Sequence, residues 1–274
     1  MVASIMSKYI VFTDLDGTLL DRNTYAFDKT LPYLEGLKNR GVPVVFCSAK
    51  TRAEQEIYRK ISGIRDPFIV ENGNAVFIED NYFDFRYPHD QEREGYWVLE
   101  YGVSYQLIRE ALQGVRSAIG VDFVGYGDLS TVEVASATGL EIKEAELAKR
   151  REYEETITTQ FEALDLEKLQ QALHSRGLRF TRGGRFFSVS SHTDKGRAVQ
   201  SLSMLFRRAY GSIITIGIGD SWNDVSMLSL VDIAFLVQQP GETWEEIDLD
   251  RVIKVDGVGP LGWVNIAKHL LERV

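Results

Sequence analysis

The chain has 274 residues, of which 44% are hydrophobic and 26% charged, and its formal net charge is −9. This composition is typical of a globular protein and excludes a disordered or low-complexity chain. The acidic excess argues against nucleic acid or an anionic membrane as the main partner, because both repel a negatively charged surface. No apolar run approaches the roughly 20 residues that span a bilayer, and the first residues lack the pattern of a secretory signal. The single cysteine, Cys47, cannot form an internal disulfide, so we expect a cytoplasmic protein.

The two ends of the chain share one pattern. Apolar, β-branched runs at 9–13, 42–47 and 68–70 are separated by helix-like segments at 31–39 and 51–61. Short apolar strands that alternate with helices are typical of a parallel sheet with both faces covered. The pattern returns near the C-terminus, with helices at 194–210 and 223–230 and strands at 212–218 and 233–237. We therefore predict an α/β fold with a Rossmann-like core.

The middle of the chain differs. Strand-like segments are predicted at 96–101, 156–161, 178–181 and 185–190, and helices at 106–119, 140–155 and 166–175. Strands and helices do not alternate strictly here, which favours an α+β unit with an antiparallel sheet. At about 150 residues per domain the length itself predicts nearly two domains. We expect a core made of residues 1–87 and 190–274 and an inserted cap made of residues 88–189.

Polar residues follow three of the predicted parallel strands. Asp14, Ser48 and Asp220 each lie at or just past the carboxyl end of a strand, which is the edge of an open α/β sheet where ligands bind. Two carboxylates brought together repel each other and are costly to desolvate unless a cation joins them. Hard oxygen ligands and water suit Mg²⁺, so we predict a magnesium site at this edge.

The first polar cluster, Asp14-Leu15-Asp16-Gly17-Thr18, contains two carboxylates separated by one residue. Residues at this spacing lie on the same side of an extended strand, so the two carboxylates can act together, and Gly17 allows the chain to bend just after them. One carboxylate can then attack phosphorus while the other handles protons. An ordinary Asp-Gly turn is the alternative, but the whole pattern directly after an apolar strand favours catalysis.

The last polar cluster runs from Gly217 to Asp224 and opens a helix, whose N-terminus favours anions. We expect Asp220 to touch the metal, and Asn223 and Asp224 to hold the metal's waters or to orient Asp220. Simple capping of the helix is the alternative. Capping explains one polar residue and leaves the glycines and the Asn-Asp pair unexplained.

Taken in order, these clusters together with Ser48 and Lys195 resemble the four motifs of the haloacid dehalogenase-like (HAD) phosphatases, in the subgroup whose cap lies between the second and third motifs. The resemblance implies that Asp14 is the nucleophile and that Asp16 protonates the leaving oxygen and later activates water. It also implies that Ser48 hydrogen-bonds a phosphoryl oxygen and that Lys195 stabilises the transferring group. The Mg²⁺ ligands that it implies, counting the backbone carbonyl of the second, are Asp14, Asp16, Asp220 and Asp224.

Residues for the rest of the substrate are suggested by three further segments. Lys50 and Arg52 follow Ser48 and either contact the substrate or form a solvated helix face. Glu71 and Asn72 follow the third strand, where they suit sugar hydroxyl groups, although Asn-Gly is also a strong turn signal. In the cap, a Gly-Gly turn lies between two arginines that would bind a carboxylate or phosphate, or that would simply be exposed on a hairpin; these are Arg182 and Arg185.

With these segments included, the chain resembles the mannosyl-3-phosphoglycerate phosphatase family. This resemblance implies a small phosphorylated glycosylglycerate as the substrate, with its glycerate carboxylate on Arg185 and its sugar hydroxyls on Glu71 and Asn72. A glucosyl substrate, another sugar phosphate, a phosphomutase and a non-catalytic sensor of phosphorylated ligands remain as alternatives. The oligomeric state is not predicted, and Cys47 is expected to be a buried strand residue and not a nucleophile.

Overall fold

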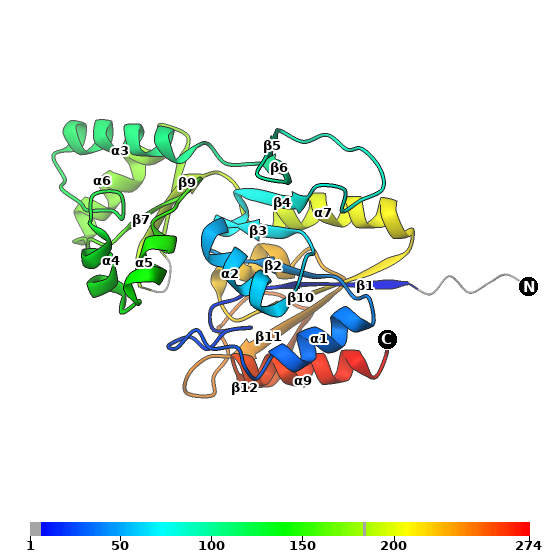
Figure 1. Ribbon diagram of the computed structural model, residues 1–274. Helices are drawn as coiled ribbons and strands as arrows, with labels where there is room; N and C mark the ends of the chain where they lie inside the picture. Colours follow the sequence, from blue (N-terminus) through cyan, green and yellow to red (C-terminus); the bar gives the residue numbers. More distant parts are fainter. Residues whose placement is uncertain (1–6, 183–184) are drawn as a thin grey trace, which may run out of the picture.

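The computed structural model describes residues 7–182 and 185–274, which form two lobes (Figure 1). The larger lobe is built on a nine-stranded sheet with the order β12-β11-β10-β1-β2-β3-β4-β6-β5. Pairing from β12 through β3 is parallel, as predicted for the core. The parallel strands are β1 (Lys8–Thr13), β2 (Val44–Cys47), β3 (Phe68–Val70), β10 (Ile213–Gly219), β11 (Ile233–Gln238) and β12 (Val252–Val258).

Helices cover both faces of this sheet. Successive residues of β1 point to opposite faces, so Val11 packs in the cluster that contains α1 and α9, and Ile10 and Phe12 pack in the cluster that contains α7. The prediction of an α/β core with a parallel sheet is thereby confirmed. The core helices are α1 (Leu31–Asn39), α2 (Arg52–Ser62), α7 (Lys195–Tyr210), α8 (Val225–Leu228) and α9 (Pro260–Leu271).

The sheet continues past β3 in antiparallel fashion. A short turn, η1 (Glu71–Gly73), leads into β4 (Ala75–Glu79), which pairs with β3 and with β6 (Tyr96–Glu100). The strand β5 (Gln91–Arg93) then closes this edge. The sequence predicted a cap strand at 96–101, and the structure shows that β6 belongs to the large sheet instead. We therefore propose that the inserted cap begins after Glu100, later than the predicted residue 88.

The smaller lobe contains a three-stranded antiparallel sheet, β7-β9-β8, with helices packed against it. Its predicted helix at 140–155 is wrong in extent, because α5 ends at Ala148 and a buried strand follows. Glu155, the last residue of that predicted helix, is fully buried in β7. The elements of this lobe are α3 (Tyr105–Ile119), α4 (Thr131–Thr138), α5 (Ile142–Ala148), β7 (Glu155–Ile157), α6 (Ala163–His174), β8 (Leu178–Arg182) and β9 (Phe187–Ser191). The described part of the chain has no helix with the length and apolar character needed to cross a membrane.

Candidate active site

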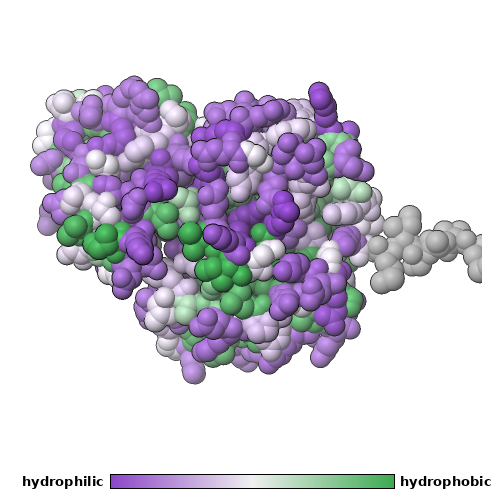
Figure 2. Space-filling view, viewed as in Figure 1, coloured by the Kyte–Doolittle hydropathy of each residue, from purple (hydrophilic) through white to green (hydrophobic). Residues whose placement is uncertain are grey.

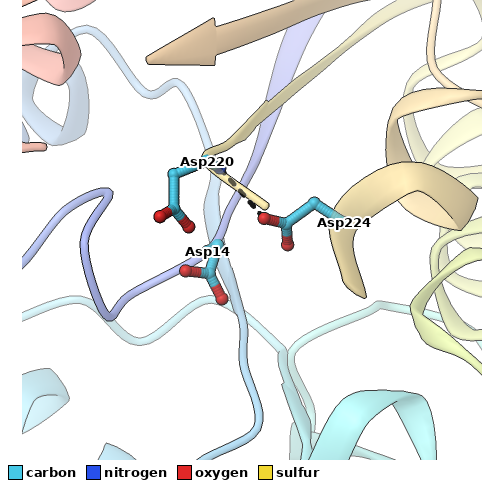
Figure 3. Close-up of side chains that lie close together, drawn as sticks. All are labelled: Asp14, Asp220 and Asp224. Atoms are coloured by element: carbon cyan, nitrogen blue, oxygen red, sulfur yellow. Dashed lines mark hydrogen bonds between the residues drawn. The ribbon is translucent and has the colours of Figure 1, made fainter. Parts of the chain in front are cut away.

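Three buried aspartates meet at the carboxyl edge of the parallel strands (Figure 3). Asp14 follows β1 and Asp220 follows β10, and these neighbouring strands pair in register, with Thr13 opposite Ile218. Asp224 comes from η2 (Trp222–Asp224), the short helical turn after β10. Carboxylate oxygens of the three aspartates lie within 4.8 Å of one another. Asp14 and Asp220 therefore lie close together at the strand ends, as the sequence predicted.

Lys195 lies in the middle of this cluster. It is the first residue of α7 and is fully buried. Its Nζ donates to Asp14 Oδ1 at 2.6 Å and to Asp224 Oδ1 at 2.7 Å. Burial alone would lower the pKa of Lys195, but the two carboxylates outweigh it and raise that pKa. The ammonium group is therefore a permanent positive charge between the two acids.

Asp224 is positioned by its surroundings as well as by Lys195. Its second oxygen, Oδ2, accepts the backbone N–H groups of Asp220 at 3.0 Å and of Ser221 at 3.2 Å. A Cβ atom at Gly219 would come within 2.5 Å of the Asp224 carboxylate, so glycine is required there. Both oxygens of Asp224 are thus already engaged, which gives this residue the geometry of a group that orients Lys195 and the Asp220 backbone.

The carboxylates outnumber the cation that they share. Burial raises the pKa of Asp14 well above its usual range, and Asp224 and Asp220 add to this while Lys195 opposes it. Burial, together with Asp224, raises the pKa of Asp220 to about 6. A metal cation bound by Asp14 and Asp220 would reduce this repulsion. The hard oxygen donors and the charge of the cluster therefore fit Mg²⁺.

Arg22 was not predicted as a site residue from the sequence. Its guanidinium pairs with Asp220 Oδ2 from the loop that follows the first motif. Asp220 Oδ1 accepts the Thr18 hydroxyl at 3.4 Å. No local pattern marks Arg22, since it lies in an ordinary polar loop and 39% of its side chain is exposed. Its charge stabilises Asp220 in this arrangement, and it lies beside the oxygens that a metal would need.

Asp16 lies next to Lys50. Lys50 Nζ is 3.1 Å from Asp16 Oδ1 and 3.3 Å from Glu54 Oε1. Burial raises the pKa of Asp16, and Lys50 opposes that rise. Lys50 is only 7% exposed and its ammonium lies 4.4 Å from the centre of the Tyr25 ring. The alternative that placed Lys50 on a solvated helix face is therefore wrong.

Ser48 is buried at the carboxyl end of β2, as predicted for a phosphate ligand. Its hydroxyl accepts the backbone N–H of Lys50 at 3.2 Å, and its carbonyl accepts the N–H of Asn72 at 3.0 Å. The preceding Cys47 is fully buried, and burial raises the pKa of its thiol. Cys47 is therefore the inert strand residue that the sequence indicated.

Arg52 faces carboxylates. Its guanidinium donates to Glu152 Oε1 at 2.8 Å, to Glu56 Oε1 at 3.0 Å and to Glu94 Oε2 at 2.5 Å. Only 16% of its side chain is exposed. Arg52 thus joins α2 to the β5–β6 turn and to the segment that leads into β7. This geometry favours neither of the two roles considered for it, a substrate contact or a solvated helix face.

Glu71 does not face a sugar site. Its fully buried carboxylate accepts the backbone N–H groups of Glu152 and Tyr153, each at 2.9 Å. The expectation that Glu71 binds sugar hydroxyls is corrected here, because both of its oxygens are taken by the chain segment at the base of the smaller lobe. Burial raises the pKa of Glu71 to about 8, although Arg151 and the two amides oppose the shift.

Asn72 lies where the two lobes and the aspartate cluster meet. Its side-chain amide donates to Glu154 Oε2 at 2.9 Å, and its oxygen accepts the amide of Asn223 at 3.3 Å. The turn interpretation of this segment also holds, since Asn72 and Gly73 have φ values of 60° and 92° and link two antiparallel strands. Asn72 and Asn223 thus connect the turn after β3 with the turn after β10.

The two cap arginines make their contacts within the smaller lobe and not with the aspartates. The guanidinium of Arg185 donates to the carbonyls of Thr138 at 2.6 Å and Ala137 at 2.9 Å, at the end of α4. Arg182 lies at the end of β8, with its guanidinium 5.9 Å from the Phe187 ring centre. The Gly-Gly turn between them lies outside the described residues. Arg185 is therefore oriented by a helix C-terminus, where a cation is also electrostatically favourable.

A family model described as haloacid dehalogenase-like hydrolase matches residues 11–246. The chain belongs to this family. The match runs from β1 through the aspartate cluster to the segment after β11, so the haloacid dehalogenase-like assignment covers both lobes. It confirms the resemblance drawn from Asp14, Lys195 and Asp220.

Relatives of the haloacid dehalogenase-like chain have specific names. A Methanococcoides burtonii protein named glucosyl-3-phosphoglycerate/mannosyl-3-phosphoglycerate phosphatase is 41% identical over 267 residues, covering 97% of this chain and 98% of its own. A Pyrococcus furiosus protein named mannosyl-3-phosphoglycerate phosphatase is 40% identical over 228 residues, covering 83% and 90%. The more specific resemblance seen in the sequence is thus confirmed by named relatives.

Solved structures share the fold at low identity. A Thermoplasma acidophilum protein has a TM-score of 0.66 at 16% identity and covers 98% of this chain and 100% of its own. A phosphatase of the haloalkanoate superfamily from Bacteroides thetaiotaomicron has a TM-score of 0.64 at 19% identity, covering 100% and 98%. These similarities support the fold of both lobes together.

Proposed function

We propose that this chain is a Mg²⁺-dependent phosphatase that hydrolyses mannosyl-3-phosphoglycerate to mannosylglycerate and phosphate. The single observation that carries the proposal is the buried bridge from Lys195 to Asp14 and Asp224, beside Asp220. This arrangement supplies a carboxylate nucleophile held by a fixed cation at the ligand-binding edge of the sheet. Intact acids and lysine argue against a non-catalytic sensor.

The chemistry that we assign begins at Asp14. A carboxylate oxygen of Asp14 attacks phosphorus, and the bond from phosphorus to the glycerate oxygen breaks. Asp16 gives its proton to that oxygen, because an alkoxide is a poor leaving group. Water then attacks phosphorus with Asp16 as the base, which frees Asp14 and regains the proton. The phosphoryl group is transferred to water in this scheme, whereas a phosphomutase would return it to a sugar.

Binding of the phosphoryl group falls to three residues in this proposal. Lys195 offsets the negative charge of the phosphoryl group, and the Ser48 hydroxyl donates to one of its oxygens. Asp14 approaches the phosphorus atom. Asp14, the backbone carbonyl of Asp16 and Asp220 would hold Mg²⁺, with Asp224 orienting them. When bound, the ion supplies charge neutralisation at the phosphoryl oxygens and screens Asp14 from the anionic substrate.

For the remainder of the substrate, the support is the pair of named relatives. Both carry a phosphoglycerate substrate in their names, and one names a glucosyl as well as a mannosyl form. We propose Arg185 for the glycerate carboxylate, because two carbonyls already orient its planar guanidinium. Asn72 and Asn223 provide amide groups beside the aspartates. A glucosyl-3-phosphoglycerate phosphatase is the second candidate, on the evidence of the doubly named relative.

The test is phosphate release with and without Mg²⁺. The panel contains mannosyl-3-phosphoglycerate, glucosyl-3-phosphoglycerate, sucrose phosphate and a simple hexose phosphate. We expect kcat/KM to be highest for the two glycosyl-phosphoglycerates. Equal values across the panel would remove the specific assignment, and no release from any ester would remove the assignment as a phosphatase.

A further inference from the structure

Two buried hydrogen bonds in series reach the backbone of Asp14 from the C-terminal helix. Trp263 lies in the first turn of α9, and its indole N–H donates to the Thr13 hydroxyl at 3.0 Å. The Thr13 hydroxyl donates in turn to the Asp14 carbonyl at 2.8 Å. Trp263 and Thr13 are both 0% exposed, and 250 positions separate them in the sequence. We call these two bonds the Trp263–Thr13 link, and it joins the last helix to the residue that follows β1.

The direction of both bonds in the Trp263–Thr13 link follows from the chemistry of the donors. An indole nitrogen carries a hydrogen and offers no acceptor site, so Trp263 must donate and Thr13 must accept. The single hydroxyl hydrogen of Thr13 is then left for another acceptor, which is the Asp14 carbonyl. Without the indole N–H, nothing would fix the rotation of that hydroxyl. Trp263 thus controls a hydrogen bond to Asp14 that it does not itself make.

The link adds a third point of attachment to Asp14. The Asp14 N–H donates to the Ile218 carbonyl of β10 at 2.9 Å, and the Asp14 carboxylate accepts from Lys195. The Asp14 carbonyl is held by Thr13. Because a peptide group is planar, fixing this carbonyl fixes the backbone plane on the C-terminal side of the Asp14 Cα atom. The direction in which the carboxylate leaves the backbone is thereby defined from both sides.

The start of α9 is packed closely against the segment that follows Asp14. Gly259, directly before the helix, has a φ of 50°, and a Cβ atom there would lie 3.1 Å from the Gly17 carbonyl oxygen. The Gly259 N–H donates to the Gln238 carbonyl at 3.0 Å, which ties this turn to β11. The backbone N–H of Trp263 donates to the Gly259 carbonyl at 3.1 Å. The backbone that carries the indole is therefore held in place independently of the link.

The link lies beneath the surface of the molecule. Figure 2 shows the groove between the two lobes, with hydrophobic residues along it, and the fully buried Trp263 contributes nothing to that surface. Trp263 also lies outside residues 11–246, which the family model matches. Its alternative role is packing alone, because a buried indole N–H needs an acceptor in any case. Packing alone predicts that a change at Trp263 lowers stability and leaves catalysis unchanged.

We propose that Trp263 and Thr13 are positioning residues, which hold the backbone of Asp14 so that its carboxylate is directed at phosphorus. This inference rests on the proposed function, in which Asp14 is the nucleophile, and deepens it. Neither Trp263 nor Thr13 touches the substrate or carries a proton in the reaction. Loss of the link misdirects the nucleophile while the substrate still binds, so kcat falls and KM does not change.

The experiment removes each hydrogen bond of the link in turn. Trp263→Phe deletes the indole N–H and keeps an aromatic ring, and Thr13→Val deletes the hydroxyl with little change in shape. We expect each variant to lower kcat for mannosyl-3-phosphoglycerate by about tenfold to a hundredfold, with KM within about twofold of the wild type. Thr13→Ser keeps the hydroxyl and should recover most of the loss. The double variant should be no slower than the slower single variant, because both changes break the same link.

Two matched controls change the same kinds of side chain elsewhere. Trp244→Phe removes an indole N–H that donates to the Val255 carbonyl at 3.3 Å, and Thr215→Val removes a hydroxyl that donates to Asp232 Oδ2 at 2.7 Å. Both controls should keep kcat within about twofold of the wild type, even where urea unfolding shows a loss of stability. The proposal is overturned if Trp263→Phe and Thr13→Val lose stability but keep kcat, or if the controls lose as much kcat as they do.

A spectroscopic measurement does not depend on turnover. The indole N–H signals are followed by NMR in isotope-labelled protein, and the signal that is absent from Trp263→Phe belongs to Trp263. We expect this signal to move upfield in Thr13→Val, where its acceptor is lost, and to keep its position in Thr215→Val. An unchanged signal in Thr13→Val overturns the link. A wild type that releases no phosphate from any ester removes the proposed function and the positioning role together, whereas an active wild type with equally active Trp263→Phe and Thr13→Val removes the positioning role alone.

Discussion

Lys195 and Asp14 are 181 positions apart in the chain and form a buried ion pair of 2.6 Å between Nζ and Oδ1. Removing the cation should destabilise the fold far more than removing the acid. We expect Lys195→Met to lower kcat at least about a hundredfold and to reduce the free energy of unfolding by about 3–5 kcal/mol, because Asp14 and Asp224 lose the charge that they share. Phosphate release and urea unfolding measure the two effects.

Asp14→Asn provides the contrast. Loss of the nucleophile should abolish turnover, but the free energy of unfolding at pH 8 should equal or exceed that of the wild type. The reason is that burial raises the pKa of Asp14, so a neutral side chain at this position avoids the free-energy cost of a buried charge. Lys195 still forms its ion pair with Asp224. An active Asp14→Asn protein would show that another residue is the nucleophile.

Mg²⁺ should stabilise the folded chain. A ligand at about 100 times its Kd adds about 2.7 kcal/mol, which corresponds to a rise in Tm of about 5 °C at this size. We expect this rise in the wild type, its loss in Asp220→Asn, and its retention in Asp248→Asn, which changes an exposed carboxylate. Chelation should stop phosphate release. An unchanged Tm with Mg²⁺ in the wild type would contradict a metal site at the cluster.

Lys50→Met should lower kcat most for esters with poor leaving groups. Without the ammonium, Asp16 loses the cation that lies 3.1 Å from its Oδ1, and under the proposed mechanism it is then less well positioned to protonate the leaving oxygen. We expect kcat to fall about tenfold for a sugar phosphate and much less for p-nitrophenyl phosphate, whose leaving group needs no proton. Lys50→Arg should recover part of the loss. Lys60→Met, at an exposed position of α2, is the control, and equal losses on both esters would refute a link to Asp16.

The raised pKa of Glu71 predicts that the free energy of unfolding depends on pH. Burial raises its pKa to about 8, above the value of an unfolded chain, so the folded state holds a proton that the unfolded state releases. Between roughly pH 4.5 and pH 8 the wild type should therefore lose stability relative to Glu71→Gln, by up to about 1.4 kcal/mol per pH unit. Urea unfolding at pH 5, 6 and 7 measures the difference. Glu35→Gln, an exposed change, should parallel the wild type, and parallel profiles for Glu71→Gln would refute the shift.

The residues at strand ends could be predicted because their placement is local. An apolar run followed by Asp14, Ser48 or Asp220 carries both the strand and the polar group at its end. Lys195 was predicted through its match to the third motif of the family, after the inserted lobe. These signals need no knowledge of which distant segments touch.

The remaining features depend on long-range contacts. Glu71 has the same local sequence whether it binds a sugar or the amides at 152–153, and only the fold decides between them. Arg52 likewise meets Glu94 and Glu152, which are distant in sequence. The strand β6 has an ordinary strand pattern, and its partner β4 is what places it in the larger lobe. Arg22 lies in a loop with no pattern at all.

The turn at Glu71–Gly73 contacts two other parts of the chain. Glu71 holds the base of the smaller lobe, and Gly73 packs so tightly that a Cβ atom there would come within 2.1 Å of the carbonyl of Asp194, just before Lys195. One short turn therefore contacts both the base of the smaller lobe and the segment that begins the helix of Lys195. A spectroscopic label near Lys195 should thus register any displacement of the smaller lobe relative to this turn.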